Sequence, residues 1–146
     1  LWLCAIIIIF KKMITSEIIK IASNTSNVGL TNKYTFKSTQ KNSMCGDIIK
    51  IELIVNNSKI NSMKYETESC IYCEASASLL AKKIKNLTVS VVKKELNKIK
   101  NISSNDPDYV FFKKFIEFKF LINKNNIKRL NCVLLPINAV LKALKQ

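Results

Sequence analysis

The sequence predicts an α+β fold in which a small antiparallel sheet of about three strands packs against several helices. Apolar and polar residues alternate along 49–55, the turn Asn56-Asn57-Ser58 follows, and residues 59–67 return with a period of two, as the strands of a hairpin do. From Glu74 onward the apolar spacing changes to three and four residues, which is the period of a helix. With 146 residues, 48% of them hydrophobic, the chain can build a sizeable core.

One helix and one short strand are predicted before the hairpin. Thr15 or Ser16 is placed to cap a helix that runs to about Ser23. Residues 24–44 are polar and are predicted to form a loop with a short strand around 34–36. The inward face of the helix is expected to consist of Ile18, Ile19 and Ala22.

Two helices and a break are predicted after the hairpin. The helices span about 74–85 and 89–99, and the break spans 101–108, where Asp106 and Pro107 stand. The expected inward residues of these helices are Ala77, Leu80, Ala81, Ile84, Val92, Leu96 and Ile99.

An aromatic segment and a last helix complete the predicted fold. The five phenylalanines at 111, 112, 115, 118 and 120 are expected to pack in the core rather than to stack on nucleic-acid bases. The last helix is predicted to start near Cys132, to accept Pro136 within its first turn, and to run to Lys145. Its inward residues should be Ile137, Val140, Leu141 and Leu144.

The net charge of +14 suits an acidic partner, a nucleic acid or an anionic membrane surface. The basic residues are lysines apart from Arg129, and they are scattered among asparagines and isoleucines rather than gathered with aromatics. We therefore expect no nucleic-acid groove.

Residues 1–15 are interpreted as an N-terminal extension and residues 16–146 as a single domain. The apolar run 1–10 is shorter than the roughly 20 residues that span a bilayer, so no membrane span is expected. Two explanations of the extension stay open: translation starts at Met13, or the run is a short hydrophobic anchor.

Five cysteines in a chain without a recognisable secretory signal indicate reduced thiols and a cytoplasmic location. If the hairpin turns between Asn57 and Ser58, paired residue numbers sum to 115, so Cys45 lies opposite Cys70. That separation suits metal ligation and also permits a disulfide. The register is provisional, because it mixes apolar with charged residues on each face.

Asp47 and Cys132 are the other candidate members of this cluster. In extended chain Asp47 points to the same face as Cys45, and Gly46 between them lets the backbone bend. Cys70 and Cys132 each precede a predicted helix, whose positive end favours the thiolate, and Arg129 should act in the same direction on Cys132. From the residues alone Cys132 is equally well explained as a buried hydrophobe.

Three segments together resemble the NifU/IscU family of iron-sulfur cluster scaffolds: Met44-Cys45-Gly46-Asp47, Cys70 to Ser78, and Arg129-Leu130-Asn131-Cys132. The likeness covers roughly Ser16 to Lys145. It implies a SufE/NifU-like sandwich that presents Cys45, Asp47, Cys70 and Cys132 as ligands at one exposed end. It also implies a scaffold that is not an enzyme, takes sulfur from a cysteine desulfurase, holds iron or a transient [2Fe-2S] cluster, and passes it to apo iron-sulfur proteins.

The chain departs from the IscU branch because Asn131 stands where that branch has histidine, and the sequence contains no histidine. In this respect it is similar to the SufU branch, which implies zinc and a role as persulfide acceptor, with Cys132 as the acceptor thiol. Cys73 is extra to the family pattern and is interpreted as buried packing or as a spare ligand or sulfur relay. A third hypothesis is a basic nucleic-acid or membrane-surface binder with structural cysteines.

Overall fold

The computed structural model describes residues 2–5, 15–102 and 111–145, and within them an antiparallel sheet of order β1-β2-β3 with helices packed on it. This agrees with the predicted α+β class. The strands are β1 (Phe36–Lys41), β2 (Ile48–Asn56) and β3 (Lys59–Glu68). The α-helices are α2 (Ser16–Ala22), α3 (Ile71–Lys83), α4 (Val89–Lys100) and α5 (Leu130–Ala143), and the 3-10 helices are η1 (Lys113–Phe120) and η2 (Lys124–Arg129).

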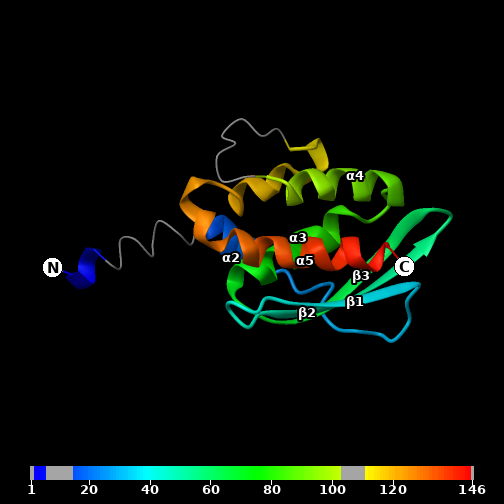
Figure 1. Ribbon diagram of the computed structural model, residues 1–146, viewed down its shortest axis with the longest axis horizontal. Coiled ribbons are helices and arrows are strands. Elements are labelled where there is room, and N and C mark those ends of the chain that lie inside the picture. Colours follow the sequence, from blue (N-terminus) through cyan, green and yellow to red (C-terminus); the bar gives the residue numbers. More distant parts are fainter. Residues whose placement is uncertain (1, 6–14, 103–110, 146) are drawn as a thin grey trace.

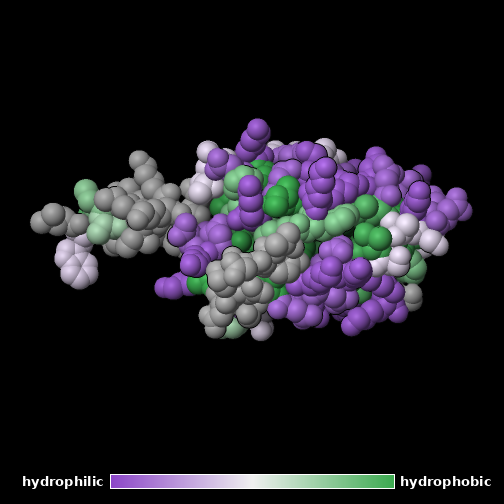
Figure 2. Space-filling view, turned by 90° about the horizontal axis from the view of Figure 1, so that it is seen from above, coloured by the Kyte–Doolittle hydropathy of each residue, from purple (hydrophilic) through white to green (hydrophobic). Residues whose placement is uncertain are grey.

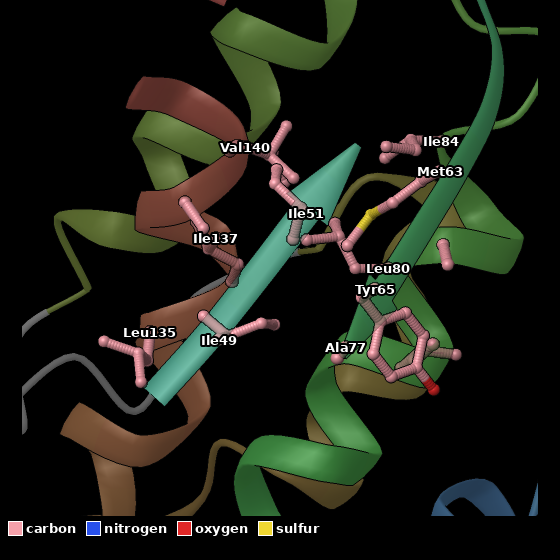
Figure 3. Packing of buried hydrophobic residues seen from close by; sticks show 14 of the residues in the cluster. Ile49, Ile51, Met63, Tyr65, Ala77, Leu80, Ile84, Leu135, Ile137 and Val140 are labelled. Carbon is pink, nitrogen blue, oxygen red and sulfur yellow. The ribbon is translucent and has the colours of Figure 1, made fainter. Parts of the chain in front are cut away.

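The elements form layers (Figure 1). Helices α3 and α5 lie on one face of the sheet, and α4 lies on the far side of α5 from the strands. In the core, Ile49 and Ile51 of β2 lie between α5 and α3 (Figure 3). Among the labelled residues around them are Ile137 and Val140 from α5, Ala77 and Leu80 from α3, and Met63 and Tyr65 from β3. None of the described helices is long and apolar enough to cross a membrane.

Over most of the hairpin the register differs by one residue from the predicted pairing, in which paired residue numbers sum to 115. Asn57 and Ser58 form its two-residue turn with positive φ angles of 51° and 62°, as a type I′ turn requires. A register shift between Ile54 and Val55 then leaves Asn61 without a partner, so pairs beyond it sum to 116. Because of this bulge Leu53 faces Met63 and Ile51 faces Tyr65, which puts the apolar residues of both strands on the core side.

Several helices and strands begin at other residues than the sequence predicted. The first strand starts at Phe36 rather than at 34, and α3 starts at Ile71, so Cys70 is its N-cap residue. Thr15 caps α2 as expected, but Ile19 is 50% exposed and Ile21 packs on the core instead. Of the predicted break at 101–108, residues 103–108 lie outside the described residues. The inward residues predicted for α3, α4 and the last helix are all buried.

The aromatic segment is only partly core. Phe115 and Phe118 of η1 are fully buried, whereas Phe112 is 39% exposed.

Seen from the α4 side, much of the surface is hydrophilic, and hydrophobic residues show between the polar ones (Figure 2). Lys94, Lys98 and Lys100 are exposed lysines of α4.

Helix α5 starts at Leu130, directly after η2, so Pro136 lies in its interior and not in its first turn. A proline there cannot donate to the carbonyl of Cys132, and its ring crowds the preceding turn. The hydroxyl of Ser76, fully buried on α3, donates to the carbonyl of Val133 at 2.6 Å. This bond gives a carbonyl of the proline-containing turn a partner from the neighbouring helix.

A loop covers part of the other face of the sheet. The carboxylate of Glu52, only 4% exposed, accepts hydrogen bonds from the backbone N–H and the hydroxyl of Thr31 and from the N–H of Asn32. Two backbone bonds join Asn27 and Gly29 to Tyr65 on β3. The polar face of β2 therefore contains one buried carboxylate, that of Glu52, and the loop supplies its hydrogen-bond donors.

Candidate metal centre

Three chain segments meet at one end of the sheet. Cys45 and Asp47 belong to the loop between β1 and β2, Cys70 stands at the junction of β3 and α3, and Cys132 is the third residue of α5. The ladder brings the first two segments together, because its last pair is Ile48 with Glu68. Cys45 and Cys70 lie beyond that pair, so they are not opposed in the ladder as the hairpin arithmetic predicted.

The loop that carries Cys45 has its own hydrogen bonds. The N–H of Gly46 donates to the carbonyl of Asn42, and the N–H of Asn42 donates to the carbonyl of Asp47, each at 2.8 Å. Gly46 has φ +75°, a conformation that glycine adopts without strain. The turn at Gly46, rather than extended alternation, therefore brings Cys45 and Asp47 to one place.

The ligand atoms of Cys45, Asp47 and Cys132 all lie within 4.8 Å of one another. The two sulfurs, Cys45 Sγ and Cys132 Sγ, are 3.8 Å apart. Cys45 is exposed, whereas Asp47 is 6% and Cys132 4% exposed. The cluster thus has one side open to solvent and two ligand groups within the protein.

Asp47 gives the clearest indication that this cluster fits a metal. Its Oδ1 accepts a hydrogen bond from the N–H of Cys70 at 3.3 Å. Its Oδ2 is buried and has no hydrogen-bond partner among the described residues. Leaving a buried carboxylate oxygen unpaired is unfavourable, and a cation bound between this oxygen and the two sulfurs would remove that penalty.

Cys70 lies next to this group rather than within it. It is half-buried, and its atoms are not part of the 4.8 Å cluster. Its sulfur is nevertheless near enough to Cys132 to affect the ionisation of that thiol. A metal ligated by all four predicted residues would require Cys70 to turn toward the other three, and its role as a ligand stays a prediction.

The expected activation of Cys132 by a helix end is wrong for the metal-free protein. Burial raises the pKa of the Cys132 thiol far above its ordinary value, and the neighbouring Cys70 and Cys45 add to the effect. Since η2 runs directly into α5, no free helix end is presented to Cys132. Arg129 instead partly offsets the rise that burial causes in the pKa of Tyr72.

Cys73 lies in the core beside the site, fully buried. Burial raises the pKa of its thiol to about 11, although hydrogen bonds from Ser69 and Thr67 act in the opposite direction. The Thr67 hydroxyl is 3.8 Å from the Cys73 sulfur and donates to the Ser69 hydroxyl at 2.6 Å. These two hydroxyls were not among the predicted site residues; their spacing in Thr67-Glu68-Ser69 just before the cysteines was the available signal.

Comparison with known proteins bears on the family and the fold of the chain. The model of the NifU-like N-terminal domain matches residues 13–106 of the chain. Among solved structures, a nitrogen-fixing NifU-like protein (N-terminal) from Brucella abortus is similar with a TM-score of 0.82 and 16% identity, covering 94% of this chain and 95% of the other.

A second similar structure is a putative iron-sulfur cluster assembly scaffold protein for the SUF system from Fervidobacterium islandicum. Its TM-score is 0.73 at 23% identity, and the match covers 90% of this chain and 96% of the other. At these identities the likeness shows the fold, and it confirms the predicted sandwich. The comparison with curated proteins gives no match.

Proposed function

Because the chain belongs to the NifU-like N-terminal domain family, we propose that it is an iron-sulfur cluster assembly scaffold without turnover of its own. In this role it receives sulfur from a cysteine desulfurase, holds iron or a transient [2Fe-2S] cluster, and transfers it to apo iron-sulfur proteins. The proposed ligands are Cys45, Asp47, Cys70 and Cys132. The observation that carries the proposal is the buried Oδ2 of Asp47, which has no hydrogen-bond partner in the described part of the chain and lies beside two sulfurs that are 3.8 Å apart.

The donor set suits cargo that must be released. Thiolates bind iron strongly, whereas a carboxylate is a harder and weaker partner for a cluster iron. Cys45 is exposed on its loop, so the cargo would be reachable from solvent on that side. Asp47 also fixes the backbone of Cys70 through its Oδ1, which links the loop to the start of α3.

The second candidate is a zinc-binding persulfide acceptor for a cysteine desulfurase. Three thiolates and one carboxylate can complete a tetrahedral zinc site without histidine, and the chain has none. Cys132 was the expected acceptor, but its burial favours the exposed Cys45 or the half-buried Cys70 as the first thiol that a donor reaches. In metal-free protein the raised pKa of Cys132 means that metal binding must release its proton.

Anaerobic reconstitution distinguishes the candidates. The purified chain is incubated with ferrous iron, cysteine and a cysteine desulfurase, or separately with zinc. A cluster absorbing visible light, lost in Cys45→Ala, Cys70→Ala, Cys132→Ala and Asp47→Ala but retained in Cys4→Ala and Cys73→Ala, is expected for the scaffold. One tight zinc with no cluster would favour the acceptor, and an unchanged metal content in all four ligand variants would exclude this site.

A further inference from the structure

Cys70 and Cys73 occupy a special pair of positions at the start of α3. Cys70 is the N-cap residue, with extended φ and ψ, and Cys73 is the third residue of the helix. Helix geometry places Cα atoms three residues apart at about 5 Å, inside the range of about 4.4–6.8 Å seen for disulfides. The two cysteines are therefore spaced so that a bond between their sulfurs needs little backbone movement.

The surroundings of Cys73 differ from those of an ordinary core cysteine. Cys73 is fully buried, yet the Thr67 hydroxyl lies 3.8 Å from its sulfur and the Ser69 hydroxyl also bonds to it. Ser69, whose oxygen accepts from the Thr67 hydroxyl, can donate its own proton to the Cys73 sulfur, and a hydroxyl donor stabilises negative charge that develops there. Cys73 lies outside the 4.8 Å cluster of Cys45, Asp47 and Cys132, so the proposed metal site does not use it.

We propose that Cys73 is a resolving cysteine that releases sulfide from a persulfide carried on Cys70. The Cys73 sulfur attacks Cys70 Sγ, the Cys70–Cys73 disulfide forms, and the bond to the outer sulfur breaks. The outer sulfur leaves with the electron pair of that bond, takes the proton of Cys73 and departs as hydrogen sulfide. The two thiols are oxidised to the disulfide and the sulfane sulfur is reduced to sulfide, so no further reductant is needed for one turnover.

This inference rests on the proposed function in one respect, since a persulfide donor must deliver sulfur to Cys70. The half-buried Cys70 can be reached by a donor, whereas Cys73 is fully buried. The sulfide is released beside Cys45, Asp47 and Cys132, which lie next to Cys70. The disulfide also withdraws Cys70 from ligation until an external dithiol reduces it.

The test uses the full metal-free chain with the exposed Cys4 replaced (Cys4→Ser), mixed anaerobically with glutathione persulfide as the sulfur donor. Sulfide release is measured over a protein-free background, and disulfides are assigned by peptide mass mapping. The expected result is one sulfide per chain together with the Cys70–Cys73 disulfide. In Cys73→Ser, whose hydroxyl can pair with Thr67 and Ser69, release should fall at least tenfold while the persulfide on Cys70 persists.

Two controls keep the result specific. Cys73→Ser and Cys73→Ala should both bind zinc as the parent does, which shows that they fold and that the metal site is intact. Sulfide release with a Cys45–Cys132 or Cys70–Cys132 disulfide, or undiminished release in both Cys73 variants, would overturn the inference. Because glutathione persulfide replaces the desulfurase, a failure of the proposed partner or cluster leaves this readout unaffected.

Discussion

At the residue scale, Asp47 combines two tasks that oppose each other energetically. One carboxylate oxygen accepts the N–H of Cys70, and the other is buried without a partner among the described residues. The second oxygen destabilises the metal-free fold and is available to a cation. Asp47 is therefore expected to lower the free energy of unfolding of the metal-free protein and to raise its affinity for a metal ion.

Asp47→Asn should therefore separate the two tasks. The amide oxygen can still accept from Cys70, while the charge is removed, so the metal-free protein should gain about 1 kcal/mol in free energy of unfolding. Zinc affinity should fall by on the order of tenfold because a carboxylate ligand is lost. Urea unfolding and zinc competition titration measure the two effects. Glu68→Gln, an exposed carboxylate at the end of β3, is the control and should change neither.

The buried Cys73 thiol gives the metal-free protein a defined dependence on alkaline pH. Its pKa is about 11 in the folded state, against about 8.5 for a free thiol. Above pH 8.5 the unfolded chain loses this proton first, so the folded state binds more protons and stability falls as pH rises. The loss approaches about 1.4 kcal/mol per pH unit up to pH 11.

Urea unfolding between pH 7.5 and 10 checks this expectation. The free energy of unfolding of Cys73→Ala should fall less steeply with pH than that of the parent, although its value at neutral pH is lower because a core side chain is truncated. Cys4→Ala, which removes an exposed thiol, should leave the slope unchanged. Equal slopes in parent and Cys73→Ala would contradict a raised pKa.

At the element scale, α5 depends on α3 for a hydrogen bond. Pro136 interrupts the interior of α5, and Ser76 on α3 donates to the carbonyl of Val133 in the same turn. Since Cys132 is adjacent to Val133, this contact fixes the segment that presents the third sulfur. Both Ser76 and Val133 are fully buried, so water does not readily replace the bond.

Ser76→Ala should destabilise the protein by about 0.5–1.5 kcal/mol, because it removes a fully buried hydrogen bond to the carbonyl of Val133. Ser78→Ala on the same helix removes a bond to the carbonyl of Asn24 that is only partly buried, and it should cost less. Thermal or urea unfolding gives both values. A smaller loss for Ser76→Ala than for Ser78→Ala would show that the Ser76 bond does not support the proline-containing turn.

At the scale of the whole molecule, the net charge of +14 is the dominant electrostatic feature. Two salt bridges are present in the described part of the chain, Lys83–Glu117 and Lys98–Glu95, so most lysines are not neutralised by carboxylates there. Self-repulsion of like charges destabilises a compact state, and salt screens it over about 10 Å at 0.1 M.

The melting temperature of the metal-free protein should therefore rise by a few degrees when sodium chloride increases from about 20 to 200 mM. Differential scanning calorimetry measures the shift, and an equal osmolality of sucrose serves as the control for solvent effects unrelated to charge. A fall in melting temperature with salt would mean that attractive pairs outweigh the repulsion.

Much of the fold followed from local patterns. The hairpin, its Asn57-Ser58 turn and the inward residues of α3 and α4 were predictable because period and turn chemistry are properties of neighbouring residues. The bulge at Asn61 was not, although the mixed faces of the unbulged register indicated a defect. The place of Pro136 was also missed, because the bond from Ser76 to the proline-containing turn comes from a different helix.

The sequence by itself determined the family, the α+β class and the identity of the candidate ligands, since these depend on motifs and on periodicity along the chain. Only the tertiary structure decided that Cys45, Asp47 and Cys132 form the tight cluster, that Cys70 stands beside it as a helix cap, and that Cys132 is buried. The physical reason is that burial and ligand distances are set by the packing of a loop, a strand end and a distant helix, which no local pattern encodes.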